Sequence, residues 1–297
     1  MKRLLPKLIG MYLNLLVYFS SRKAGKVGFY LFCTPRRMVL KDHQHVFLDS
    51  AAKSSFYCDG TRIQVYRWGR GEKNVLFLHG WQSHTFRWKN YIESFSKEKF
   101  SVYAFDAPGH GHSRGKYLNL PIYSHVLETF LNLAGPMDAI VGHSLGSFAA
   151  LYTLHRVEEL PVKQLVITGT PGEVNEFFEF YQKMLGLSGR SVRAIRNAFM
   201  QNIQNYPEYF SAPKFAQSIL IPGLIIHDKD DEETPYHHAI AIHRDWKGST
   251  LITTSGLGHN LRSANVVKQV VDFITRQLET QTSSPSQRDL VNKNIVQ

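Results

Sequence analysis

The sequence predicts an α/β fold in which a mostly parallel central sheet is flanked by helices. Three observations lead to this prediction. Short apolar runs alternate with segments of helical period along most of the chain, and such alternation requires crossover connections between parallel strands. Several of these runs are continuously apolar, as strands covered on both faces are. One long helical stretch interrupts the alternation, which predicts a helical cap inserted into the sheet.

The expected strands are the apolar runs that turn signals bound. The first alternates polar and apolar residues, and the second ends at His79-Gly80. A Gly-rich turn, APGHGHSRG, follows the third strand, and Gly135-Pro136 precedes the fourth. In chain order, the predicted strands are 62–68, 74–78, 102–105, 138–141, 164–168, 224–226 and 251–254.

Helices are expected between these strands, where apolar residues recur at helical spacing. They are predicted at 86–95, 122–133, 147–157, 236–246 and 266–278. The stretch from about 173 to 217 has no strand signal and is rich in aromatic, Leu, Met and basic residues at helical spacing. This stretch is the predicted cap.

The length of 297 residues suits one large α/β domain with an inserted subdomain better than two independent cores. We therefore expect an N-terminal apolar and basic helical segment over 1–60, the α/β domain with its cap over 61–280, and a polar tail over 281–297. The tail has little to bury, which favours a frayed end. Cys33 and Cys58 are expected to be reduced, because a domain of this size needs no disulfide.

The net charge of +11 favours encounters with anionic surfaces. The basic residues are scattered and no nucleic-acid recognition motif is found in the sequence, so we do not expect nucleic acid as a partner. The densest basic stretches flank apolar runs near the N-terminus, at Lys2-Arg3, Arg22-Lys23, Lys26 and Arg36-Arg37. This arrangement favours peripheral contact with an anionic membrane.

Residues 1–19, MKRLLPKLIGMYLNLLVYF, have four interpretations. A signal peptide is disfavoured because no A-x-A cleavage site is present and Arg22-Lys23 stand where small residues are expected. A spanning helix is disfavoured because it needs about 20 apolar residues. Two interpretations stay open: an interfacial helix with Lys7 and Asn14 on a narrow polar stripe, or a helix packed on the protein's own core or over its pocket. The expected location is cytoplasmic, peripheral at the inner membrane surface.

The segment 140–146, IVGHSLG, places a serine in the pattern G-x-S-x-G. An apolar strand is expected before it and a helix of small residues after it. Glycine on both sides permits a turn too tight for larger side chains, which lifts the Ser144 hydroxyl clear of the sheet. The N-terminus of the following helix favours developing negative charge. Ser144 is therefore the candidate nucleophile.

Four motifs, in this order, resemble those of the α/β-hydrolase superfamily in its lipase, esterase and peptidase branches. They are LFLHGW at 76–81, DAPGHGHS at 106–113, GHSLG at 142–146 and GLGHN at 256–260. The resemblance runs from about Arg62 to Leu278 and excludes the segment before it. It implies the α/β-hydrolase fold and a Ser-His-Asp triad.

A serine hydroxyl needs a base to remove its proton, and the resemblance assigns this role to His259, on the loop after the last strand. The family's acid stands four residues before a proline that begins a helix, which selects Asp231 before Pro235 among five crowded carboxylates. The other four are expected to be solvated loop charges. The oxyanion hole is expected from the backbone N–H groups of Trp81 and Leu145.

His79 and His143 lie inside the motifs and are expected to shape the oxyanion loop and the turn that carries the serine. The sequence has no P-loop, no dinucleotide fingerprint and no histidine pair spaced as a zinc site, so no cofactor and no metal are expected.

The resemblance implies hydrolysis through an acyl-enzyme. Because the cap is rich in Phe, Tyr, Leu and Met, the expected substrate is a small-molecule ester with an apolar acyl part, as for a carboxylesterase or a monoacylglycerol lipase. An aminopeptidase, a thioesterase or a carbon–carbon bond hydrolase would use the same residues. A non-catalytic binding relative is the alternative of another class.

Overall fold

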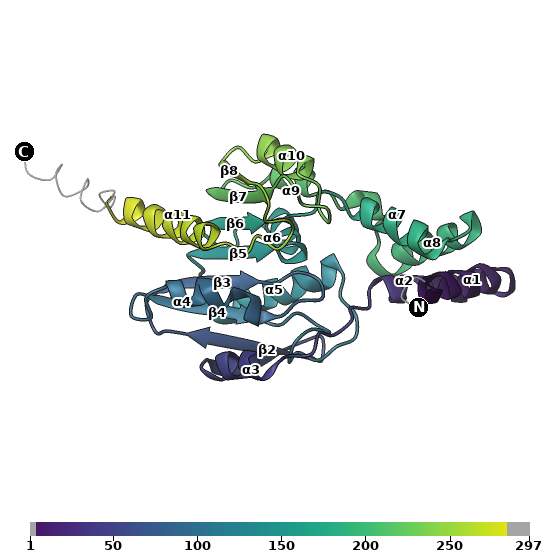
Figure 1. Cartoon of the computed structure of the whole chain (residues 1–297), viewed down its shortest axis with the longest axis horizontal. Coiled ribbons are helices and arrows are strands. Elements are labelled where there is room, and N and C mark those ends of the chain that lie inside the picture. The colour runs from purple at the N-terminus through teal and green to yellow at the C-terminus, as the bar shows by residue number, and fades with distance from the viewer. Residues whose placement is uncertain (1–3, 284–297) are drawn as a thin grey trace, which may run out of the picture.

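The computed structural model describes residues 4–283 and contains one eight-stranded sheet (Figure 1). The strand order is β1-β2-β4-β3-β5-β6-β7-β8. Strand β2 pairs antiparallel with β1 and β4, and every other neighbouring pair is parallel. The predicted α/β class with a mostly parallel sheet is confirmed. The strands are β1 Ala52–Cys58, β2 Thr61–Trp68, β3 Lys73–Leu78, β4 Phe100–Phe105, β5 Ala139–His143, β6 Leu165–Thr168, β7 Gly223–Asp228 and β8 Ser249–Thr254.

Helices cover both faces of the sheet, because successive side chains of a buried strand point to opposite faces. On β3, Leu76 and Leu78 pack with residues of α5, α6, α9 and α10, whereas Val75 and Phe77 pack with residues of α3, α4 and α11. The result is a sheet between two helical layers. The helices are α3 Asp42–Asp49, α4 Lys89–Ser94, α5 Leu120–Ala134, α6 Leu145–Arg156, α9 Ala212–Ala216, α10 His237–Asp245 and α11 Ala264–Ser283, with short 3₁₀ turns η1 Thr85–Trp88 and η2 Pro207–Tyr209.

Strand β1 was not predicted. Its residues are mostly exposed and carry no apolar alternation, because β1 is an edge strand of the sheet. The turn that joins it to β2 did carry a signal. Asp59 and Gly60 both have positive φ, of 46° and 72°, which is the requirement of a type I′ hairpin turn and explains the Asp-Gly pair.

Four helices form a separate group beside the sheet (Figure 1). They are α1 Leu4–Phe19, α2 Ser21–Phe32, α7 Val174–Leu185 and α8 Gly189–Ile203. Their side chains share an apolar cluster that includes Leu13, Phe29, Phe178, Ile195 and Phe199. We call this group the four-helix cap. The inserted helices α7 and α8 lie between β6 and β7, where the cap was predicted, and the N-terminal helices complete it.

The packing of α1 on the cap is close. A Cβ on Gly10 would lie 1.8 Å from the Leu185 carbonyl oxygen, so only glycine allows this approach. The Asn14 side chain donates to the Gly186 carbonyl at 2.9 Å and accepts from the Ser188 N–H at 2.7 Å. The polar residue of an otherwise apolar helix thus bonds to the turn between α7 and α8.

The predicted polar tail begins at 281. Residues 281–283 belong to α11, and the remainder of the tail lies outside the described residues. Among residues 4–283, no helix combines the length and apolar character that crossing a bilayer requires.

Candidate active site

Ser144 lies on the turn between β5 and α6 and has φ 53° and ψ −123°. A non-glycine residue held at positive φ is strained by about 1–3 kcal/mol and is common at functional sites. The flanking glycines are required by close contacts. A Cβ on Gly142 would lie 2.6 Å from the Ser147 backbone nitrogen, and a Cβ on Gly146 would lie 2.3 Å from the Leu78 carbonyl oxygen. The sequence pattern thus reflects steric need on both sides of the serine.

His259 lies on the loop after β8 and bonds to Asp231, on the loop after β7. The His259 Nδ1 and Asp231 Oδ2 atoms are 2.9 Å apart. Because the carboxylate accepts, Nδ1 carries the proton and Nε2 is left as the basic nitrogen. This is the arrangement expected of a general base held by its acid.

Asp231 is buried and receives several hydrogen bonds. Its Oδ1 accepts from the backbone N–H groups of Glu233, at 2.9 Å, and Thr234, at 2.8 Å, and its Oδ2 accepts from the Thr234 hydroxyl at 2.7 Å. Burial by itself would raise the pKa of this carboxyl, but the bonds from His259 and Thr234 outweigh it and the pKa lies below its usual value. Asp231 is therefore an anion beside the imidazole.

The expectation that the other loop carboxylates are solvated is wrong for Asp228, which is fully buried. Its Oδ2 accepts from the Thr254 hydroxyl at 2.6 Å and from the Leu257 N–H at 3.0 Å. Asp230 is exposed but accepts from the Gly256 N–H at 2.8 Å. Both carboxylates thus hold the loop that carries His259, because that loop has N–H groups with no strand partner. Glu232 and Glu233 are exposed as expected.

His143 connects the serine turn to the His259 loop. Its Nε2 donates to the His259 carbonyl oxygen at 2.8 Å. Burial holds the pKa of His143 well below its usual value, so the ring is neutral. No hydrogen bond joins the Ser144 hydroxyl to His259 within residues 4–283, and catalytic hydrogen bonds of substrate-free enzymes are often long.

The loop that follows β3 passes directly against the serine, because a Cβ on Gly80 would lie 2.8 Å from the Ser144 Cβ. His79 anchors this loop: its Nε2 accepts from the Ala107 N–H at 2.9 Å, and its Nδ1 donates to the Gly80 carbonyl at 2.8 Å. Burial lowers the pKa of His79 to about 3, so the ring is neutral in this role.

The two backbone N–H groups expected to form the oxyanion hole donate no hydrogen bond within the described residues. In the described part of the chain, neither the Trp81 N–H nor the Leu145 N–H donates a hydrogen bond to the protein. Leu145 is the first residue of α6, where backbone N–H groups have no partner within the helix. Both groups are thus available to an anionic oxygen beside Ser144.

Thr234 is a site residue that the sequence analysis missed. Besides its bond to Asp231, its hydroxyl lies 3.1 Å from His259 Nδ1, and the residue is buried. Its place between the candidate acid and Pro235 was the available signal.

Replacing Thr234 by Val is expected to lower turnover about tenfold and to destabilise the fold by about 1–2 kcal/mol, because a buried carboxylate loses a donor. Asp231 has a depressed pKa, so its stabilising effect is present above the ordinary carboxyl pKa of 3.8 and is lost as pH falls through the folded value. Urea unfolding across pH should therefore show a deficit at neutral pH that shrinks in acid. Thr234→Ser keeps the hydroxyl and serves as the control. A pH-independent deficit, or equal loss in both variants, would contradict this role.

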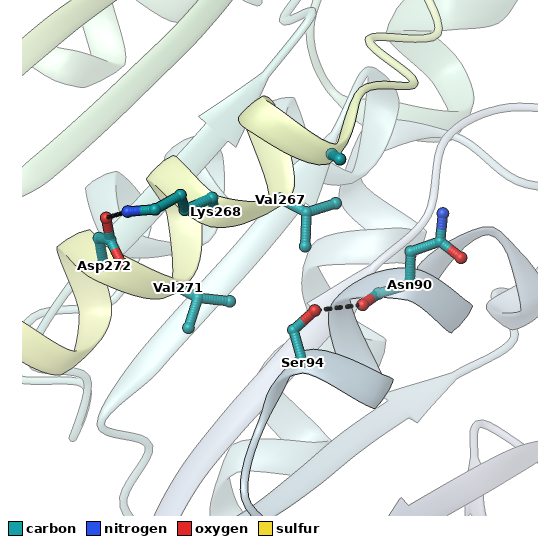
Figure 2. Close-up of a pocket in the computed structure, with 7 residues that line it drawn as sticks. Asn90, Ser94, Val267, Lys268, Val271 and Asp272 are labelled. Atoms are coloured by element: carbon teal, nitrogen blue, oxygen red, sulfur yellow. Dashed lines mark hydrogen bonds and ion pairs between the residues drawn. The ribbon is translucent and has the colours of Figure 1, made fainter.

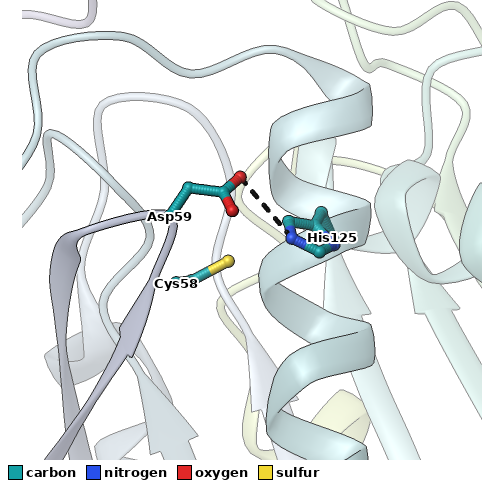
Figure 3. Close-up of side chains that lie close together, drawn as sticks. All are labelled: Cys58, Asp59 and His125. Atoms are coloured by element: carbon teal, nitrogen blue, oxygen red, sulfur yellow. Dashed lines mark ion pairs between the residues drawn. The ribbon is translucent and has the colours of Figure 1, made fainter.

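Two groups of side chains in the described residues are close enough to hold a metal ion. Cys58, Asp59 and His125 form one, in which the Asp59 carboxylate lies 3.5 Å from His125 Nε2 (Figure 3). Burial raises the pKa of the Cys58 thiol, and metals bind the thiolate, so this group is a poor site. The other group comprises Glu176, His237 and His238.

In that second group, His238 is buried and its Nε2 lies 2.9 Å from the Glu176 carboxylate. Glu176 belongs to α7 and His238 to α10. The pair therefore connects the four-helix cap to the α/β domain, which accounts for its geometry without a metal.

A pocket of about 340 Å³ lies between α4 and α11 (Figure 2). It is lined by Asn90, Ser94, Ala264, Val267, Lys268, Val271 and Asp272. Lys268 pairs with Asp272 at 2.6 Å, and the Ser94 hydroxyl donates to the Asn90 carbonyl at 2.7 Å. None of the candidate catalytic residues borders it, so this pocket is separate from the site around Ser144.

Comparison with known proteins identifies relatives of this chain. The family described as serine aminopeptidase, S33, matches residues 69–212. A bifunctional esterase/perhydrolase of Acinetobacter calcoaceticus is 25% identical over 267 residues, covering 73% of this chain and 97% of that protein. A pimeloyl-[acyl-carrier protein] methyl ester esterase of Hamiltonella defensa is 29% identical, over 37% of this chain and 42% of that protein.

Solved structures share the fold. A putative lipase from Acinetobacter baumannii superposes with a TM-score of 0.62 at 19% identity, covering 82% of this chain and 99% of that one. A bacterial membrane phospholipase A superposes with a TM-score of 0.63 at 18% identity, covering 93% of this chain and 98% of that one. The phospholipase structure superposes on a larger share of this chain than the lipase structure does.

Proposed function

Because the chain belongs to the α/β-hydrolase superfamily and is a hydrolase of its esterase and lipase type, we propose that it cleaves carboxylic esters with an apolar acyl part through Ser144, His259 and Asp231. One observation carries the proposal. His259 bonds to Asp231, and His143 bonds the loop of His259 to the strained turn of Ser144. The proposed nucleophile, acid and base thus lie on three loops, at the carboxyl ends of the parallel strands β5, β7 and β8.

In the proposed reaction, the Ser144 oxygen attacks the ester carbonyl carbon as His259 Nε2 takes its proton. The carbonyl oxygen becomes an anion that the Trp81 and Leu145 N–H groups stabilise. Asp231 stabilises the imidazolium. The C–O bond to the alcohol then breaks, and His259 gives its proton to the leaving oxygen. The product of this half is an acyl-serine.

Water completes the reaction by the same route. His259 takes a proton from the water as its oxygen attacks the acyl carbon. The bond to Ser144 breaks, the proton returns to the serine oxygen, and the carboxylic acid leaves. No electrons are exchanged with a cofactor in either half.

The apolar acyl part is the finer element of the proposal. Its support is the aromatic and aliphatic composition of the cap and the ester-cleaving names of the relatives. The family's description names an aminopeptidase, which the same residues would serve. Bond type is thus the first quantity to measure.

The test is a panel of p-nitrophenyl esters of rising chain length, run beside amino-acid anilides and a thioester. We expect kcat/KM to be highest for esters and to rise with acyl length, since each added methylene contributes about 0.8 kcal/mol on burial. Faster turnover of the anilides would replace the ester proposal by a peptidase. Faster turnover of the thioester would replace it by a thioesterase.

We also propose that the protein is cytoplasmic and reaches a membrane surface peripherally. The charge of the chain and the character of its N-terminal residues support this.

A further inference from the structure

Helix α1 exposes a wide apolar surface to solvent. Its eight most exposed apolar residues are between 52% and 81% accessible: Leu4, Leu5, Leu8, Met11, Tyr12, Leu15, Tyr18 and Phe19. At about 100° per residue they fill a continuous arc of roughly 140°. A helix on the surface of a globular protein normally turns an apolar stripe of about this width toward the core. Here it faces outward, and we call it the outer face of α1.

The polar residues of α1 lie on the side that meets the cap. Asn14 bonds to the turn between α7 and α8, and the Lys7 ammonium donates to the Lys183 carbonyl at 3.3 Å. Both residues of the predicted polar stripe thus bond to the cap. Gly10, Leu13 and Val17 are buried beside it. One side of the helix is therefore packed on the protein, as the packed-helix interpretation expects. The other side is exposed and apolar, as an interfacial helix requires.

The N-terminal segment that contains the outer face is basic in sequence. The first 41 residues contain nine Lys and Arg and no Asp or Glu, whereas the whole chain has a net charge of +11. Arg22 and Lys23 follow α1 directly, are exposed, and take part in no ion pair of the described residues. On the cap, the Arg190 guanidinium lies 4.9 Å from the centre of the Tyr18 ring.

We propose that the outer face of α1 is the surface through which this protein docks on an anionic lipid bilayer, with α1 lying flat at the interface. The apolar arc would enter the acyl boundary while Lys and Arg side chains meet the lipid phosphates. Tyr12 and Tyr18 suit the headgroup region, where amphipathic rings are enriched. The 16-residue helix is about 24 Å long, shorter than a hydrocarbon core of about 30 Å, so it lies along the surface.

The positive charge of the N-terminal segment disfavours a second copy of this chain as the partner of the outer face. A symmetric dimer through the outer face would bring together two N-terminal segments that each carry exposed Arg22 and Lys23 and contain no acidic residue. Like charges at an interface oppose association. An anionic bilayer instead provides an acyl region for the exposed apolar side chains and phosphate groups of opposite charge for the Lys and Arg side chains.

The first test measures binding to vesicles of phosphatidylcholine, with and without phosphatidylglycerol, by co-sedimentation. We expect the full chain to bind the anionic vesicles more tightly, and high salt to weaken that binding. The double variant L8Q/L15Q should weaken binding to anionic vesicles by at least about tenfold, because two exposed leucines no longer enter the acyl region. Glutamine preserves helix propensity and both positions are exposed, so the fold should stand.

The matched control is L133Q/L220Q, which changes leucines that are 66% and 92% exposed elsewhere on the surface. It should bind as the unmodified chain does. Equal binding by L8Q/L15Q and the unmodified chain would overturn the proposal, as would no binding by either. A dimer that L8Q/L15Q splits, without vesicle binding, would assign the outer face to a second copy instead.

The second test separates charge from apolar contact. R22Q/K23Q should weaken binding to anionic vesicles roughly tenfold or more and change binding to neutral vesicles little. K99Q/K116Q removes the same charge from exposed lysines outside the N-terminal segment and should have a small effect. Equal losses in both variants would mean that net charge, and not this surface, drives binding, which contradicts the proposal.

The inference does not depend on the proposed reaction. Ser144→Ala should bind vesicles as the unmodified chain does, and L8Q/L15Q should keep its turnover of a water-soluble ester. The docking surface and the hydrolase activity can therefore fail separately. Substitution is also cleaner than deleting α1, because deletion would expose the apolar side of α7 and α8.

Discussion

Ser144→Ala is expected to lower ester turnover by roughly 10⁴- to 10⁶-fold, the range seen when a triad member is removed. Without the hydroxyl there is no atom to form the acyl-enzyme, and only the oxyanion donors remain to assist water. The fold should be unchanged, because the Ser144 side chain makes no hydrogen bond in the described residues and Ala removes a single atom. The measurement is turnover of one p-nitrophenyl ester beside labelling by a fluorophosphonate probe.

Labelling supplies the sharper outcome. The probe should fail to react with Ser144→Ala and should still react with Ser147→Ala, which changes a buried serine three positions along the chain. A labelled Ser144→Ala would show that the nucleophile lies elsewhere. Loss of labelling in both variants would point to a collapsed turn rather than to a missing nucleophile.

Asp231→Asn is the second large effect, with an expected loss in turnover of about 10⁴-fold. The amide oxygen can still accept from the Glu233 and Thr234 N–H groups. Its NH₂ group would then face His259 Nδ1 and favour the ring with its proton on Nε2. That tautomer cannot take a proton from Ser144. Its cation would lose the buried anion at Nδ1, and the Glu233 carboxylate, 3.8 Å from Nε2, is exposed to solvent and stabilises it less.

Asp230→Asn is the matched control for this substitution. The hydrogen bond that its carboxylate accepts from the Gly256 N–H can be kept by an amide oxygen, so turnover should fall less than about tenfold. Asp228 differs from Asp230, because it is buried and both of its carboxylate oxygens accept hydrogen bonds. Asp228→Asn should mainly lower the melting temperature. Near-normal activity of Asp231→Asn beside an inactive Asp230→Asn would move the acid to Asp230.

The parts of the fold that could be predicted are those whose signal is local. Buried parallel strands such as β3 and β7 are continuous apolar runs, so their positions agree with the prediction within a few residues. The edge strand β1 has one side in solvent and no such run. The place of β4 between β2 and β3 is set by sheet pairing, which no local pattern records.

The candidate site shows the same division. Ser144, Asp231 and His259 stand in short motifs whose spacing reflects tight turns and loop ends. Asp228 was misjudged because a run of loop carboxylates resembles solvated charge, and its burial depends on donors from residues 254–257. The side of α1 that is buried could not be predicted either, since its partners are more than 170 residues away.

The helices α7 and α8, on which α1 packs, are synthesised long after α1 itself. Asn14 and the Gly186 carbonyl it bonds are 172 residues apart, so at about 5–20 residues per second the ribosome takes roughly 9–34 s to make one after the other. Throughout this interval α1 has α2 beside it but neither α7 nor α8, so the apolar side that these two helices later cover is unprotected. A nascent chain with such a helix is exposed to chaperones and to membrane capture before the loops of Asp231 and His259 are made. Slowing translation between residues 20 and 186 would lengthen that exposure, and speeding it would shorten it.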